Sequence, residues 1–138
     1  MLRLLSIFLS CVLLLLFDCR ESNKKDAYEI RERCGKSAAQ WAKSKSGEIF
    51  NFRSHYNAEH NKCFILATLS PVVSNNFYTS FDILYDVDEN KEYGHYTSRS
   101  YDNGTPNNHQ CIIKGKYYGH NEQAEDKWQA FVKTVMEE

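Results

Sequence analysis

Residues 77–87, Phe-Tyr-Thr-Ser-Phe-Asp-Ile-Leu-Tyr-Asp-Val, have the clearest period-two pattern in the chain. Successive side chains of a strand point to opposite faces, so the odd-numbered residues, which are mostly apolar, share one face. Residues 88–91 are typical of a turn, and residues 92–98 return as the second arm of a hairpin. We therefore predict an antiparallel hairpin that carries Asp86 and Asp88 on its solvent face.

Five other segments complete the predicted fold. Residues 48–56 carry aromatic side chains of one parity, residues 63–69 are apolar on both parities, and residues 109–118 supply the last strand. Apolar side chains recur every three or four positions over residues 26–42 and again over residues 124–135, as in amphipathic helices. The pattern predicts an α+β fold with an N-terminal helix, about five mainly antiparallel strands and a C-terminal helix, both helices lying against one face of the sheet.

Residues 1–19 have the character of an export leader. The start Met-Leu-Arg is followed by an apolar run that ends before Asp18. A positive start and an apolar core of about 7–15 residues are typical of secretory signals, whereas a membrane-spanning helix needs about 20 apolar residues. We expect residues 1–19 to be a signal peptide or lipoprotein leader, residues 20–26 a polar tether, and residues 27–138 a single α+β domain.

The end of the leader leaves its processing open. Leu16-Phe17-Asp18-Cys19 resembles a bacterial lipoprotein box, with Cys19 as the residue that would carry the lipid. Asp18 departs from that pattern, because glycine, alanine or serine is usual there. A soluble exported protein and an uncleaved signal anchor are the alternatives.

Beyond Cys19 the chain has three cysteines, Cys34, Cys63 and Cys111. Cysteines of exported proteins are more often paired than free. Cys34 lies on the apolar stripe of the first helix and Cys63 opens the central strand, so a helix packed on the sheet would bring them together. We predict the disulfide Cys34–Cys63, with Cys63–Cys111 as the second choice if the strands of those two residues are neighbours.

No motif predicts a catalytic, cofactor-binding or metal site. The five histidines lack the helical and Cys-x-x-Cys spacings of zinc sites, so we expect no metal and no cofactor. His55 and His95, both on predicted strands, could hold a metal only if they faced each other. An enzyme remains the alternative, with His55, His60 or His95 as an acid–base group beside an aspartate.

Tyrosines gather in the second half of the chain, among histidine and basic residues. Tyrosine and arginine are enriched in protein interfaces, and five residues are candidates for a binding surface: His95, Tyr96, Arg99, Tyr101 and Tyr117. Ordinary strand composition is the alternative, because tyrosine suits a half-buried sheet. The formal net charge of −1 argues against a basic nucleic-acid binder.

Four segments, residues 34–41, 54–57, 61–66 and 128–138, resemble small exported or lipoprotein-like bacterial proteins of unknown function. The resemblance implies an envelope location and brings no activity, cofactor or catalytic residue with it. We expect a non-enzymatic domain that is exported to the periplasm or anchored there by lipid. Its expected partner is an envelope protein or glycan, and inhibition of an extracytoplasmic enzyme is one version of that role. Contact with the membrane is expected through a lipid anchor at most, and nucleic acid is not an expected partner.

Overall fold

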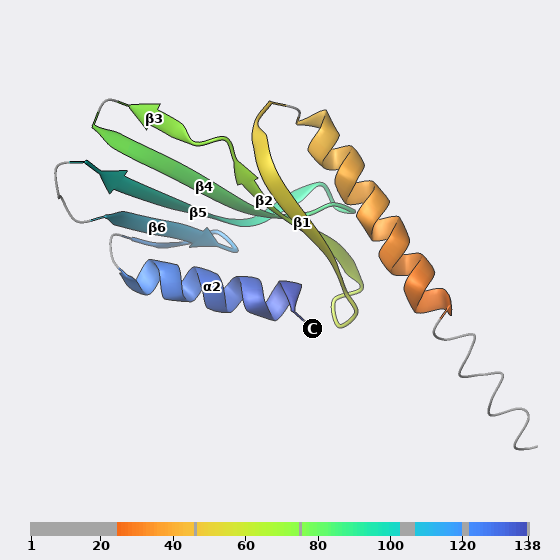
Figure 1. The fold of residues 1–138 in the computed structure, drawn as a ribbon. Helices are drawn as coiled ribbons and strands as arrows, with labels where there is room; N and C mark the ends of the chain where they lie inside the picture. Colours follow the sequence, from red (N-terminus) through yellow and green to blue (C-terminus); the bar gives the residue numbers. More distant parts are fainter. Residues whose placement is uncertain (1–24, 46, 75, 103–106, 120–121, 138) are drawn as a thin grey trace, which may run out of the picture. The chain divides into compact units, whose positions relative to one another are not determined.

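The structure of the chain is a computed structural model, drawn in Figure 1. It describes residues 25–45, 47–74, 76–102, 107–119 and 122–137. The expected leader, the lipid-anchor candidate Cys19 and most of the expected tether therefore lie outside the described residues. The chain divides into two units, Met1–Arg33 and Cys34–Glu138.

The first helix is described over residues 25–44 and includes residues 25 and 26, which the sequence assigns to the tether. Its residues 34–44 belong to the second unit, where Cys34, Ala38 and Ala42 are buried. Their spacing of four places these side chains on one side of the helix, as the apolar stripe predicts. Within the described part of the chain, no helix is both long enough and apolar enough to cross a membrane.

The second unit is built on a seven-stranded antiparallel sheet. The strands are β1 (Ile49–Asn57), β2 (Lys62–Leu69), β3 (Val72–Ser74), β4 (Phe77–Asp86), β5 (Lys91–Tyr101), β6 (Asn108–Ile113) and β7 (Lys116–Tyr118). They lie in the order β1-β2-β4-β5-β6-β7, and β3 pairs with the part of β4 that β2 does not reach. The closing helix α2 (Glu122–Met136) runs beside β6 (Figure 1).

The α+β class is confirmed, with two more strands than the sequence predicts. The expected strand over residues 109–118 is divided into β6 and β7 by a tight turn at Lys114 and Gly115, whose φ angles are 48° and 79°. Positive φ at both central residues defines the hairpin turn that joins two twisted strands most closely. Strand β3 escapes sequence prediction because it has only three residues, all of them exposed.

The two helices pack on opposite faces of the sheet. Phe64 of β2 belongs to the core under α2, whereas its neighbour Ile65 packs against Ala38 and Ala42 of the first helix. Adjacent strand residues point to opposite faces, so the expectation that both helices lie against one face is wrong. It also follows that β2 is apolar on both parities because both of its faces are covered.

Trp128 is the centre of the core beneath α2. Its side chain is 1% exposed and stacks on Tyr96 of β5, with ring centroids 6.2 Å apart. The strand passes close beneath the indole at Gly94, where an added Cβ would lie 3.2 Å from the Trp128 ring and 2.5 Å from the Ile112 carbonyl oxygen. Glycine is therefore required at this position by the close approach of the neighbouring strand and of α2.

The predicted disulfide Cys34–Cys63 is confirmed, with Cα atoms 5.3 Å apart. It ties the first helix to the start of β2. The second-choice bond Cys63–Cys111 is excluded because Cys63 is already bonded, and Cys111 is a buried free thiol. Disulfides persist in oxidising compartments, so this bond indicates an extracytoplasmic location.

Candidate functional site

The face of the sheet opposite α2, beyond the part that the first helix covers, is called the open face here. Directly paired residues of antiparallel strands lie on the same face, and the register places one continuous row across six strands. The row consists of Phe52, Ala67, Ile83, His95, Ile112 and Tyr117. Phe52 and Tyr117 at its two ends are 38% and 52% exposed. Between them Ala67 is fully buried and Ile83 and Ile112 are partly buried, so the open face exposes aromatic side chains mainly at the two ends of the row.

Four of the five residues predicted to form a binding surface lie together on the open face. His95, Arg99 and Tyr101 are odd-numbered residues of β5 and therefore share one face. Tyr117 lies in the same cross-strand row as His95, with Ile112 between them. The Arg99 guanidinium lies 4.8 Å from the centroid of the Phe77 ring, and its Nε donates to Thr79 Oγ1 at 3.3 Å. These contacts hold an exposed cation in a fixed place among aromatic rings.

Tyr96, the fifth predicted residue, does not belong to this surface. It is 7% exposed and lies on the opposite face, between Trp128 and the stacked ring of His109. Its hydroxyl hydrogen-bonds to His109 Nδ1 at 2.5 Å. Burial, followed by the negative charge of Glu125, raises the pKa of Tyr96 to about 12. Tyr96 is therefore a core residue, because its position in β5 has the parity that faces α2.

The three histidines considered for acid–base work do not meet. His55 is paired with Phe64 on the α2 face, whereas His95 lies on the open face, so these two cannot share a metal ion. His60 follows β1 and contacts the edge of the Phe64 ring. His95 Nδ1 lies 2.6 Å from Glu92 Oε1, so its acidic neighbour is a glutamate rather than an aspartate.

Within the described ranges, no three histidine, cysteine, aspartate or glutamate side chains lie close enough together to hold a metal ion. The absence of a metal therefore stays a prediction from the sequence.

Asp86 is fully buried, which corrects the expectation that it lies on a solvent face. Its Oδ2 accepts a hydrogen bond from Lys62 Nζ at 2.7 Å, and its Oδ1 accepts the backbone N–H groups of Asp88 and Glu89, each at 3.0 Å. The Lys62 ammonium also contacts Glu89 Oε1 at 2.6 Å and the Tyr93 hydroxyl at 2.9 Å. The pKa of Lys62 is raised, first by the bond to Asp86 and then by the bonds to Glu89 and Tyr93.

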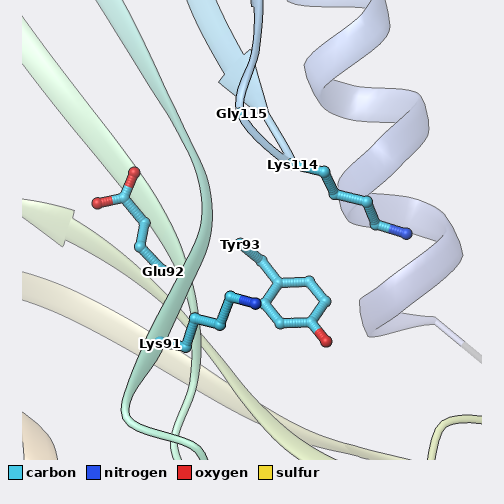
Figure 2. Close-up of a pocket in the computed structure, with 5 residues that line it drawn as sticks. All are labelled: Lys91, Glu92, Tyr93, Lys114 and Gly115. Carbon is cyan, nitrogen blue, oxygen red and sulfur yellow. The ribbon is translucent and has the colours of Figure 1, made fainter.

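A cavity of about 500 Å³ opens between the start of β5 and the β6–β7 turn. Its lining consists of Lys91, Glu92, Tyr93, Lys114 and Gly115. In the view of Figure 2, the Tyr93 ring lies between Lys91 and Lys114, and the Glu92 carboxylate extends away from the ring. Small-molecule sites occupy about 300–1,000 Å³, so the cavity has the size of a ligand site.

Sequence reasoning did not single out this cavity. Lys91 is the first residue of β5 and Lys114 lies in the β6–β7 turn, far away in sequence, and the pairing of β5 with β6 brings these two segments together. The dipeptide Lys114-Gly115 was the available signal, because a glycine between two short extended segments marks a hairpin turn.

No protein-family model, curated protein or solved structure matches this chain.

Proposed function

We propose that this protein is a non-enzymatic domain, exported to the periplasm or anchored there by lipid, which binds a protein partner in the bacterial cell envelope. The single observation that carries the proposal is the make-up of the open face, on which an exposed Arg99 lies against the Phe77 ring and the cross-strand row ends in the exposed aromatic side chains of Phe52 and Tyr117. Solvent-exposed surfaces that combine aromatic and arginine side chains are typical of protein interfaces. The disulfide supports the extracytoplasmic part of the proposal.

A protein partner is favoured over a glycan by the chemistry of this face. Tyrosine and arginine supply most binding hot spots in protein interfaces. Arg99 is already braced by Phe77 and Thr79, so it can receive a carboxylate without first losing rotamer freedom. We expect the partner to present an acidic side chain to Arg99 and an apolar patch to the row of Ile83 and Ile112.

The binding prediction is tested with two variants and a matched control for each. Arg99→Ala and Tyr117→Ala are each expected to weaken binding of the partner captured from envelope extract about 30-fold, the effect of losing one hot spot of about 2 kcal/mol. Arg53→Ala and Tyr78→Ala remove the same side-chain types from the other face and are expected to leave affinity unchanged. Affinity is measured by titrating each variant against the captured partner.

Three outcomes would contradict the binding proposal. Equal affinities for the Arg99 and Arg53 variants would place the interface elsewhere. A ligand that survives protease treatment of the extract would be a glycan rather than a protein. Failure of the wild-type protein to retain any envelope component would remove the proposed role. Capture is therefore supporting evidence only when it depends on Arg99 and Tyr117.

Export is predicted to depend on residues 1–18, and a lipid, if the protein carries one, is expected on Cys19. The positive start, the leucine-rich run and the cysteine at its end are the reasons. Intact-mass measurement of the protein purified from its native cell should give a chain that lacks residues 1–18, and any added acyl mass should be lost in Cys19→Ala. A cytoplasmic form that still begins at Met1 would contradict export, and an exported form without acyl mass would contradict the anchor.

A small extracytoplasmic enzyme is the second candidate, with His55, His60 or His95 as the acid–base group. Of these three histidines, His95 is the one with an acidic side chain at contact distance in the described part of the chain, namely Glu92 at 2.6 Å on the edge of the open face. That pair would need a substrate held beside it, so hydrolysis that is lost in His95→Ala and kept in Tyr117→Ala would support the enzyme over the binding domain.

A further inference from the structure

Strand β1 presents a long free edge that lacks the usual protection against pairing with another chain. Within the described sheet, β1, β3 and β7 each pair on one side only. Strands β3 and β7 have three residues each, Pro71 precedes β3, and β7 begins at Lys116. Short length, proline and lysine are common devices that prevent edge-to-edge association. Strand β1 has nine residues without proline or lysine, and its register with β2 is regular from Asn51 to Asn57. It is therefore the edge that can accept a further strand.

The hydrogen bonds of β2 determine which backbone groups of β1 point outward. The Cys63 carbonyl oxygen accepts the Val87 N–H at 2.9 Å, so the odd-numbered residues of β2 are hydrogen-bonded to β4. Residue pairs of antiparallel strands alternate between hydrogen-bonded and non-hydrogen-bonded, so the even-numbered residues of β2 are hydrogen-bonded to β1. The register partners of those residues in β1 are odd-numbered. Phe52, Ser54 and Tyr56 therefore direct their N–H and C=O groups away from β2, toward the free edge.

No other segment of the described chain covers this edge. The side chains of residues 50–54 are all exposed, although neighbouring residues of a strand point to opposite faces. The first helix packs over Ile65 and Tyr85, which belong to β2 and β4. Helix α2 reaches β1 at Asn57, the last residue of the strand, whose Nδ2 donates to the Val135 carbonyl oxygen at 3.2 Å. The middle of β1 is therefore open to solvent on both faces and along its outer edge.

We propose that β1 of a second copy of this chain pairs with this edge, antiparallel, about a two-fold axis at Ser54. Ser54 then pairs with Ser54 of the second copy, and Phe52 pairs with Tyr56 of the second copy. Every outward N–H and C=O group of these three residues finds a partner, because paired residues whose groups face each other exchange both hydrogen bonds. The sheets of the two copies join into one continuous sheet across the axis.

The side chains of β1 favour this register. Phe52 is 38% exposed, and opposite Tyr56 of the second copy it forms an aromatic cross-strand pair, which stabilises antiparallel strands. An axis at Arg53 would place the two Arg53 side chains opposite each other, and like charges in that position are destabilising. An axis at His55 would carry Phe52 past the end of the second strand. With the axis at Ser54, each Arg53 lies opposite His55 of the second copy. Strand β1 is therefore complementary to itself, as a two-fold interface requires.

The first test measures dimerisation of the mature protein and of two variants at Ser54. Because the Ser54 N–H points away from β2, Ser54→Pro leaves the hydrogen bonds between β1 and β2 intact and removes the two central donors of the dimer. We expect it to weaken dimerisation about thirtyfold, the effect of losing two hydrogen bonds. Ser54→Ala is the matched control, because it keeps the N–H, and it should dimerise as the wild type does. Sedimentation equilibrium over a range of protein concentrations measures the dissociation constant of each protein.

The second test is a disulfide cross-link at the axis, in a Cys111→Ala background. Hydrogen-bonded partners in antiparallel strands have Cα atoms about 5.5 Å apart, which is within the range of about 4.4–6.8 Å that a disulfide needs. Mild oxidation should therefore link Ser54→Cys into a covalent dimer. Asn51→Cys is the matched control, because it lies three residues from the axis and about 20 Å from its copy along the strands, so it should stay unlinked. This test leaves the backbone of β1 unchanged, so it also decides the outcome where Ser54→Pro fails to fold.

Four results would overturn the proposed pairing. The first is a wild-type protein that stays monomeric at every concentration, and the second is a Ser54→Pro variant that dimerises as tightly as Ser54→Ala. The third is equal cross-linking of the Ser54→Cys and Asn51→Cys variants. The fourth is a monomeric wild type whose capture of an envelope protein is lost in Ser54→Pro, which would assign the edge to a strand of another protein.

Discussion

Replacing Asp86 by alanine is expected to lower the free energy of unfolding by about 3–5 kcal/mol, the usual effect of breaking a buried ion pair. The Asp86 side chain has no exposed surface and accepts three hydrogen bonds, from Lys62 Nζ and from the backbone N–H groups of Asp88 and Glu89. Its removal leaves two backbone N–H groups of the β4–β5 turn without their acceptor and takes the buried partner from Lys62. The measurement is urea unfolding followed by tryptophan fluorescence.

Glu89→Ala is the matched control for Asp86→Ala. Glu89 lies just as close to Lys62, at 2.6 Å, but its side chain is 50% exposed. An exposed ion pair stabilises by about 0–1 kcal/mol, so the control should lose much less. Asp86→Asn keeps an oxygen for the two backbone N–H groups and loses the charge, and should fall between the two variants. Equal losses for Asp86→Ala and Glu89→Ala would show that the burial of Asp86 does not matter to stability.

Loss of the disulfide is expected to lower the free energy of unfolding by about 3–4 kcal/mol. The bond joins residues 29 positions apart, and in the chain-entropy account a cross-link that closes a loop of this length restricts the unfolded chain by about that amount. The double variant Cys34→Ala, Cys63→Ala should reproduce the effect that a reductant has on the wild type. Chemical unfolding with and without dithiothreitol measures both.

Cys111→Ala provides the control for the disulfide experiment. Because Cys111 is a free thiol, this variant should remain sensitive to reductant, while the double variant should be insensitive. Cys111→Ala itself should cost only about 1 kcal/mol, the effect of removing a small buried group. A Cys111→Ala protein that no longer responds to reductant would show that Cys111 takes part in the bond.

Features of the fold that depend on residues close together in the sequence are predicted correctly. The alternation over residues 77–87 predicts β4, and the spacing of Cys34, Ala38 and Ala42 predicts the buried side of the first helix. The Cys34–Cys63 bond follows from that helix side and from the double-sided apolar pattern of β2. In each case the residues that allow the prediction lie within a single helix or strand, or within two such segments.

The errors arise where distant segments decide the environment. Asp86 has the polarity of a solvent-facing residue, and its burial depends on Lys62 and on the turn that follows β4. Tyrosine is a common residue on exposed strand faces, but Tyr96 occupies a position of β5 whose side chain points toward α2, where it stacks on Trp128. The bulge at Tyr93 further shifts the faces of β5 relative to β4. No local pattern reports which face of a sheet a helix will cover.

The buried thiol of Cys111 makes correct oxidation depend on the order of assembly. Its Sγ lies 3.3 Å from the Ala124 carbonyl oxygen, and burial raises its pKa. Little thiolate is then available to attack the Cys34–Cys63 bond in the finished fold. That protection comes from α2, which follows all seven strands in the sequence. Until α2 docks, three thiols can exchange partners, so the docking of α2 is the step that prevents incorrect disulfide pairing.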